Sequence, residues 1–178
     1  IDGIILSNIV QFDIHPAACV YAMENKTKDG NELLPIRLEN IDAEETQETI
    51  TTWKDGNPGA SSLFKSNGKY TIEHYVQDKI TTNCHRLDTI MNEHNIPCVD
   101  IIWMDLQGAE LLALKGLGNK LSSVKYVYTE VSHKEMYTGQ VMFKELNDYM
   151  IKNDFLILNN LSFRGWQEDI IYKKKNSH

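Results

Sequence analysis

Acidic side chains follow four short apolar runs that have the composition of β-strands. Asp13 comes after the first run, residues 42–45 after the second, Asp105 after the third, and Glu130 lies near the end of the fourth. In an open α/β sheet, ligands bind beyond the carboxyl ends of the strands, so we expect these carboxylates to share one edge. Ionised carboxylates only accept hydrogen bonds. Together they would suit ribose hydroxyls, an amine or a cation.

The residues around Asp13 and Asp105 suggest separate roles for them. Asp13 stands where such folds place a carboxylate that accepts both hydroxyls of an adenosine ribose. It would also cap a helix that begins at Pro16, and both roles can hold. Asp105 is followed by Gly108, which lets backbone or ligand approach closely. Glu110 would lie in the first turn of the next helix, where the helix dipole favours a carboxylate. We therefore expect Glu110 to be structural.

Hydrophobic patterning predicts the elements that position these groups. Strands are predicted at residues 8–12, 34–38, 50–53, 99–104, 124–131, 155–158 and 169–172, and residues 70–84 have strand character. Helices are predicted at residues 16–24, 87–94, 109–116 and 142–153. Buried strands followed by helices indicate a single α/β domain over residues 1–178. Its sheet should be doubly wound and mostly parallel, with an antiparallel hairpin at the C-terminal edge.

Composition excludes several classes of protein. The 178 residues include 18 basic and 25 acidic side chains, a net charge of −7, which disfavours non-specific binding to nucleic acid or to an anionic membrane. No apolar run reaches the roughly 18 residues of a membrane span, and no signal-peptide pattern opens the chain. The three cysteines fit no zinc-binding spacing, so we expect reduced thiols and a cytoplasmic location.

One segment resembles a known family. Residues 99–110, VDIIWMDLQGAE, and the helix ending LKG at 114–116 resemble the hallmark of the FkbM-type methyltransferases, a strand followed by D-x-E-G-A-E and a helix closing in L-K-G. Further segments agree in order along nearly the whole chain: FDIHP at 12–16, GASSL at 59–63, YTEV at 128–131, Tyr137, and GWQED at 165–169. The chain departs from the family at Gln107, where a Glu is usual.

The resemblance implies an S-adenosylmethionine-dependent O-methyltransferase with a Rossmann-like sheet. Cofactor-binding residues would be Asp13, Ile41, Asp42, Gln107 and Gly108, with the adenine near residues 41–43. Substrate-binding residues would be Ser61, Ser62 and Tyr137, in part on a loop that is either a mobile lid or an ordinary surface loop. The glycine-rich turn that holds the cofactor's carboxypropyl end in this family is not visible. We therefore expect the first strand and that turn to be missing upstream.

The expected chemistry is proton removal from an acceptor hydroxyl, which a general base accelerates. Asp105 and His133 are candidates for the base, and Glu130 would orient one of them or the acceptor. A divalent cation held by Asp105 and Glu130 is possible but disfavoured, because Gln107 removes a charged oxygen ligand. A carbohydrate hydroxyl is the expected acceptor. The alternatives are a nucleoside-binding module without catalysis and another doubly wound enzyme acting on nucleotide sugars.

Overall fold

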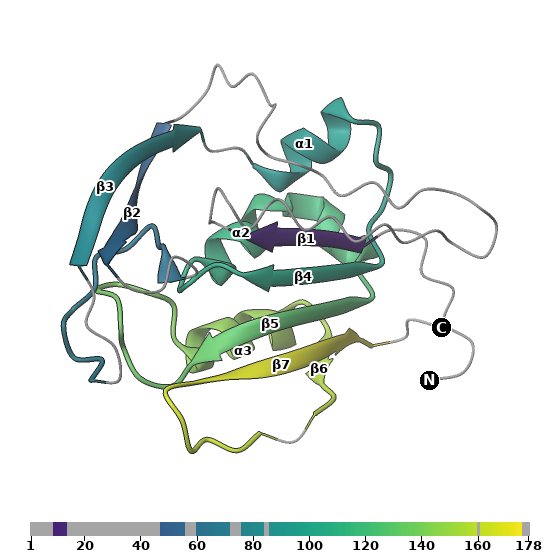
Figure 1. Cartoon of the computed structure of the whole chain (residues 1–178). Coiled ribbons are helices and arrows are strands. Elements are labelled where there is room, and N and C mark those ends of the chain that lie inside the picture. The colour runs from purple at the N-terminus through teal and green to yellow at the C-terminus, as the bar shows by residue number, and fades with distance from the viewer. Residues whose placement is uncertain are drawn as a thin grey trace.

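The computed structural model describes residues 9–13, 47–55, 60–71, 76–83, 86–159 and 161–175 (Figure 1). The strands are β1 (Ile9–Asp13), β2 (Gln47–Asp55), β3 (Val76–Asn83), β4 (Ile101–Asp105), β5 (Tyr126–Ser132), β6 (Phe155–Ile157) and β7 (Gln167–Lys174). The helices are α1 (Leu87–Glu93), α2 (Glu110–Gly116), a 3₁₀ helix (Gly118–Ser123) and α3 (Phe143–Lys152). The predicted helix at 16–24 and strand at 34–38 lie outside the described residues.

In the part of the chain that the structure describes, five strands form one mixed sheet in the order β1-β4-β5-β7-β6. The pairings of β1 with β4 and of β4 with β5 are parallel, whereas β7 runs antiparallel to both β5 and β6. Figure 1 shows α2 and α3 behind this sheet, and the two helices contact each other. The predictions of an α/β fold and of an antiparallel C-terminal hairpin are confirmed. Within the described residues the sheet is mixed rather than mostly parallel, because β7 enters between β5 and β6.

The strands β2 and β3 form a separate antiparallel ribbon. The sequence predicted only a short strand at 50–53 and indefinite strand character over 70–84. Threonine and isoleucine favour extended backbone, and both β2 and β3 contain these residues. The extended backbone covers Gln47–Asp55 and Val76–Asn83. No periodicity in either segment indicates that its partner is the other one, so the sequence could not separate this ribbon from the main sheet.

The core lies between the sheet and helices α2 and α3. The sheet contributes Ile102, Met104, Val127, Val131, Ile170 and Tyr172, and the helices contribute Leu111, Leu114, Leu146 and Met150. Burial of one such leucine side chain stabilises the fold by about 1.5–3 kcal/mol. Among the described residues, no helix is both long enough and apolar enough to cross a membrane.

Two predictions of burial are wrong. The segment 99–104 predicts a buried strand, but burial alternates along β4 and Trp103 is 42% exposed. The Trp103 ring packs edge-on against Tyr128 of the neighbouring strand. On α2, the spacing of Ala109, Leu112, Ala113 and Gly116 predicts that they share one face, but Leu112 is 54% exposed, since Leu111 and Leu114 face the core instead. In a seven-residue helix that is apolar on several sides, spacing alone does not fix the buried face.

Candidate active site

Two carboxylate-bearing residues end neighbouring parallel strands at the same level. The register pairs Asp13, the last residue of β1, with Asp105, the last residue of β4. Glu130 lies on β5, the next strand along, and the arrowheads of β1, β4 and β5 point the same way in Figure 1. The shared edge predicted from sequence is confirmed for the backbone positions of these three residues. Residues 41–45, with Ile41 and Asp42, lie outside the described residues.

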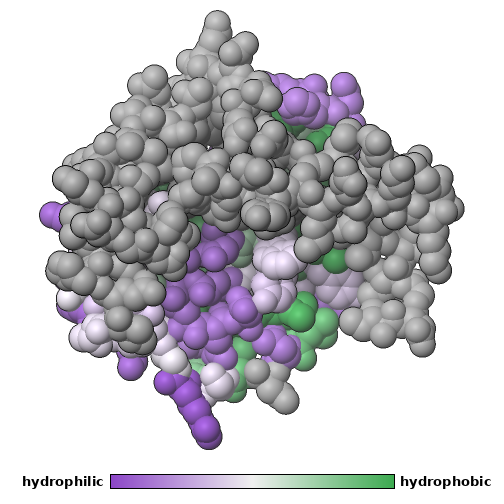
Figure 2. Space-filling view, viewed as in Figure 1, coloured by the Kyte–Doolittle hydropathy of each residue, from purple (hydrophilic) through white to green (hydrophobic). Residues whose placement is uncertain are grey.

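The polar character of this edge is visible on the molecular surface. On the sheet face opposite α2 and α3, Figure 2 shows hydrophilic residues toward the ends to which β4 and β5 point, and hydrophobic residues toward their starts. Asp105 is exposed and Glu130 is half-buried. Polar and charged groups are therefore concentrated where a ligand of an α/β sheet is expected to bind.

The side chain of Gln107 joins the two carboxylates. Its Nε2 donates to Asp105 Oδ1 at 2.6 Å and to Glu130 Oε2 at 3.3 Å. A second amide, from Gln167 at the start of β7, donates to the same Glu130 oxygen. An amide nitrogen is a donor only, so two carboxylates that would otherwise repel each other are joined by neutral N–H groups.

The other end of the Gln107 side chain faces a buried hydroxyl. Tyr137 is fully buried, and its single hydroxyl proton is shared between two acceptors, the Ala60 carbonyl at 2.7 Å and Gln107 Oε1 at 3.2 Å. The Gln107 backbone carbonyl accepts a hydrogen bond from Ser62 Oγ at 2.7 Å. These contacts fix which way the amide points, because its oxygen meets a donor while its nitrogen meets two acceptors.

The loop after β4 requires a glycine at position 108, because the backbone has a positive φ there and packs closely against another loop. Gly108 has φ +99°, and a Cβ at this position would lie 2.5 Å from the Cβ of Gln140. The Val141 N–H donates to the Gly108 carbonyl at 3.0 Å, which brings the two loops into contact. Glu110 Oε1 accepts from the backbone N–H groups of Leu106 and Gly108, at 3.1 and 3.2 Å. The Glu110 side chain thus stabilises the turn through two hydrogen bonds to its backbone, in accord with the structural role expected for it.

Burial changes the acid–base properties of two carboxyl groups here. Burial, with the nearby charge of Asp105, raises the pKa of Glu130 to about 8. Burial also raises the pKa of Glu110 to about 7, although backbone N–H groups oppose the shift. Near neutral pH, Glu130 therefore carries a proton for much of the time. Groups whose environments separate their pKa values can divide acid and base roles between them.

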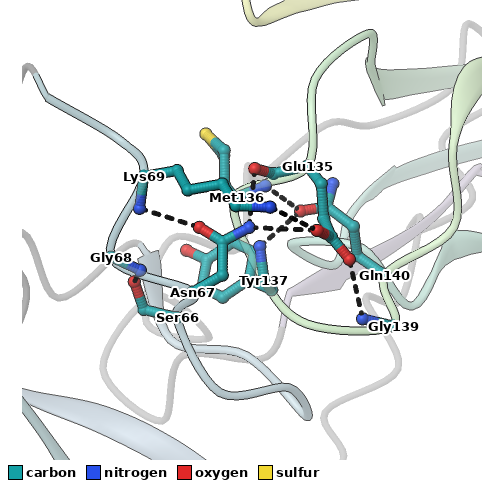
Figure 3. A network of polar contacts seen from close by, with 9 residues as sticks. All are labelled: Ser66, Asn67, Gly68, Lys69, Glu135, Met136, Tyr137, Gly139 and Gln140. Atoms are coloured by element: carbon teal, nitrogen blue, oxygen red, sulfur yellow. Dashed lines mark hydrogen bonds and ion pairs between the residues drawn. The ribbon is translucent and has the colours of Figure 1, made fainter.

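The segment 60–70 packs against the loop that follows β5, as Figure 3 shows. The Asn67 backbone N–H donates to the Met136 carbonyl at 2.8 Å, and Asn67 Nδ2 donates to the Glu135 carbonyl at 2.8 Å. Gln140 Oε1 accepts from the N–H groups of Met136 and Tyr137 at 2.7 and 2.6 Å. These bonds hold Tyr137 where its hydroxyl reaches Gln107.

Ser61 and Ser62, expected on a substrate-binding loop, are 1% and 0% exposed. The Ser62 hydroxyl bonds Gln107 and also accepts from the Phe64 N–H at 3.0 Å. The structure thus brings Ser62, Tyr137, Gln107, Asp105 and Glu130 into one hydrogen-bonded set. Contact of these serines with a substrate stays a prediction.

His133 is placed with different partners. Its Nε2 contacts the carboxylate of Glu168 on β7, and its ring packs against Phe143 and Phe163. The structure pairs it with Glu168 rather than with Asp105. Sequence reasoning did not single out Glu168, Gln167 or Gln140. The first two lie within the segment GWQED, which the resemblance had noted only as a fit to the C-terminal third.

Comparison with known proteins identifies the family. The domain described as "Methyltransferase FkbM domain" matches residues 9–157, which cover most of the chain. The chain belongs to the FkbM methyltransferase family. Among curated proteins, it is similar to "2-O-methyltransferase NoeI" of Sinorhizobium fredii (strain NBRC 101917 / NGR234), with 35% identity over 71 residues. That match covers 40% of this chain and 29% of the relative. No solved structure matches the chain.

Within this FkbM domain, the donor set that the described residues place around Gln107 does not suit a divalent cation. The described residues contain no group of three or more His, Cys, Asp or Glu side chains that could hold a metal ion. A hard cation requires oxygen ligands, whereas Gln107 presents its nitrogen to both Asp105 and Glu130.

Proposed function

We propose that this chain is an S-adenosylmethionine-dependent O-methyltransferase that acts on a hydroxyl of a sugar or glycan, built on the doubly wound, Rossmann-like sheet of such enzymes. The observation that carries the proposal is the Asp105–Gln107–Glu130 arrangement at the carboxyl edge of the sheet of an FkbM domain. The name of the relative, a 2-O-methyltransferase, supports transfer to oxygen.

Cofactor binding is assigned to the end of β1 and the loop after β4. Asp13 ends β1 level with Asp105, and a carboxylate there can accept hydrogen bonds from both ribose hydroxyls. Gly108 lies in the adjoining loop, and because Gln140 occupies the space where its Cβ would stand, a contact with the cofactor here would come from the Gly108 backbone. When bound, S-adenosylmethionine supplies a methyl group on a sulfonium centre, which is activated toward attack by an oxygen nucleophile.

Asp105 is the proposed general base. It ends β4 at the exposed edge, and Gln107 Nε2 donates to one of its oxygens at 2.6 Å, which restrains the position of the carboxylate. Its carboxylate takes the proton as the acceptor hydroxyl loses it, and such a base contributes about 10²–10⁴-fold to the rate. Alignment of the hydroxyl with the methyl group supplies much of the remainder.

Glu130 has a complementary role in this scheme. Because burial raises its pKa to about 8, it is a weak candidate for the base and can donate a hydrogen bond as the acid. We assign it to orient the acceptor. His133, held by Glu168 at the same edge, is the alternative base.

The function is tested by incubating the chain with S-adenosylmethionine and a panel of mono- and oligosaccharides. Formation of S-adenosylhomocysteine, together with a methylated sugar in the mass spectrum, supports the proposal. Tight binding of S-adenosylhomocysteine without transfer to any sugar or other hydroxyl compound would indicate a nucleoside-binding module. Stabilisation by uridine or nicotinamide nucleotides, and not by adenosyl ligands, would overturn the proposal.

A further inference from the structure

The loop between β6 and β7 presents a phenylalanine in an unusual backbone conformation. Phe163 has φ +51° and is 58% exposed. A bulky residue in the left-handed region is an outlier, and exposure of its ring leaves an apolar group in water. Such strain persists only where surrounding contacts enforce it, and it is concentrated at ligand-binding and active sites.

Glu168 enforces this conformation. Its carboxylate accepts hydrogen bonds from the Phe163 N–H at 3.3 Å, the Ser162 N–H at 2.8 Å and the Ser162 hydroxyl at 3.1 Å, and it also contacts His133. The Phe163 ring packs against His133 and Phe143, with ring centres 5.0 and 5.5 Å apart. We call Phe163, His133 and Phe143 the aromatic platform. The Phe163 ring of this platform is held in place by these contacts, while much of its surface remains exposed to solvent.

The platform borders the candidate active site. The His133 N–H donates to the Trp166 carbonyl at 2.8 Å, and the next residue, Gln167, donates to Glu130. On the other side, Phe143 begins α3 two residues after Val141, whose N–H bonds the Gly108 carbonyl. Both backbone connections lead from the platform to the edge that carries Asp105 and Glu130.

We propose that the aromatic platform is an acceptor-binding subsite on which a pyranose ring stacks against Phe163; this inference rests on the proposed function. A pyranose has a face rich in C–H groups and a rim of hydroxyls. The negative face of an aromatic ring attracts the C–H face of the sugar. The carboxylates of Asp105 and Glu130, at the adjoining edge of the sheet, can accept hydrogen bonds from its hydroxyls. A wholly apolar acceptor would add no hydroxyl donor to those that Gln107 and Gln167 already supply.

The test measures saturation-transfer NMR from the chain to the methyl glycosides of glucose, mannose and galactose, with S-adenosylhomocysteine present. Cyclohexylmethanol serves as an apolar probe. The variants are Phe163→Gly, which removes the ring and relieves the left-handed strain, and Phe163→Trp, which restores an aromatic surface. Leu158→Ala is the matched control, since Leu158 is another exposed apolar residue of the same loop, at 55%.

We expect transfer to the ring protons of at least one glycoside in the wild type, in Phe163→Trp and in Leu158→Ala. Phe163→Gly should weaken binding about 3- to 10-fold, the range of one aromatic contact, without lowering the unfolding temperature. Equal glycoside binding by wild type and Phe163→Gly overturns the subsite, as does preference for cyclohexylmethanol or no glycoside binding at all. Calorimetry with S-adenosylhomocysteine is run in parallel, because failure of the wild type there contradicts the proposed function rather than the platform.

Discussion

The amide of Gln107 connects a buried hydroxyl to a catalytic candidate, since its Oε1 accepts from Tyr137 at 3.2 Å while its Nε2 donates to Asp105 at 2.6 Å. The Tyr137 hydroxyl also lies 2.7 Å from the Ala60 carbonyl oxygen, to which it donates a hydrogen bond. The orientation of Asp105 therefore depends on segment 60–70 being packed against the loop after β5. A residue that departs from the usual family glutamate is thus the centre of the hydrogen-bonded set.

Gln107→Glu should destabilise the fold and create a cation site. The change replaces a donor to Asp105 and Glu130 with a third carboxylate, which should lower the free energy of unfolding by about 1–3 kcal/mol. Three carboxylates form a ligand set that Ca²⁺ or Mg²⁺ accepts, so millimolar Ca²⁺ should recover much of the loss in thermal unfolding. Gln167→Glu, which contacts only Glu130 of the pair, should recover less. Equal stability of Gln107→Glu and wild type in chelator would contradict this account.

Asp105→Asn should retain the fold and the affinity for S-adenosylhomocysteine while turnover falls at least about 10²-fold, the lower range for a general base. The asparagine oxygen can still accept from Gln107, which preserves the geometry. The measurement is methyl transfer to a glycan acceptor, with and without chelator. Asp148→Asn is the control, since Asp148 is an exposed carboxylate paired with Lys144 on α3. Full activity in Asp105→Asn rejects the residue as the base, and chelator inhibition reversed by Mg²⁺ would make it a metal ligand.

Stability should fall as pH rises through the slightly acidic and neutral range. The folded pKa of Glu130 is raised from 4.5 to about 8, so the folded state binds more protons than the unfolded state between these values. The free energy of unfolding therefore decreases with rising pH across this window, by up to a few kcal/mol at about 1.4 kcal/mol per unit.

Glu130→Gln should remove most of that dependence. The measurement is urea unfolding at about pH 5 and about pH 8, with Glu145→Gln as the control, since Glu145 is exposed on α3. Glu110, whose pKa is raised to about 7, should leave a residual slope that levels off at lower pH than the Glu130 contribution. An unchanged slope in Glu130→Gln would show that Glu130 is not the group responsible.

Gly108→Ala should be far more costly than Gly139→Ala. Both glycines have positive φ, +99° and +82°, so both substitutions carry the left-handed penalty of about 1–2 kcal/mol. At Gly108 the new Cβ would also lie 2.5 Å from the Gln140 Cβ, whereas at Gly139 no atom lies within 4 Å. We expect an extra loss of about 1–3 kcal/mol at Gly108 from overpacking. Chemical denaturation of the two variants decides the matter, and equal losses would exclude the close approach of the two loops.

Asp13→Ala should weaken binding of S-adenosylhomocysteine by about 2–3 kcal/mol, the magnitude for hydrogen bonds to a charged group. This corresponds to about 30- to 150-fold in the dissociation constant. Isothermal titration calorimetry measures the change, and Asp148→Ala controls for the loss of a charge elsewhere. Affinity equal to the wild type would remove Asp13 from the cofactor site.

The parts of the fold set by local pattern could be predicted. The apolar run before Asp105 and the glycine after it located β4, its loop and α2, and parallel pairing then placed Asp13 beside Asp105. Helix α3 was also predicted within a residue at each end. These features depend on residues close together in the chain, where composition and periodicity contain the information.

Contacts between distant residues could not be predicted in the same way. Gln167 reaches Glu130 across 37 positions, and Tyr137 reaches Ala60 across 77. The segment with Ser61 and Ser62 looked like a surface loop because it is polar, but Ser62 is buried and its hydroxyl bonds the Gln107 carbonyl. The polar composition of this segment therefore predicted exposure to solvent, whereas its polar groups are buried and form hydrogen bonds with other protein groups.

Strand β7 follows the other described strands along the chain, and this order determines when the site is completed during synthesis. Domains assemble as the chain emerges from the ribosome, and most of the described site comes from residues 60–143. However, Gln167 and Glu168, which hold Glu130 and His133, belong to the last strand of the sheet. A nascent chain that has already made Asp105, Gln107 and Tyr137 still lacks the strand that orients Glu130. The candidate site therefore reaches its final geometry only after β7 has been translated.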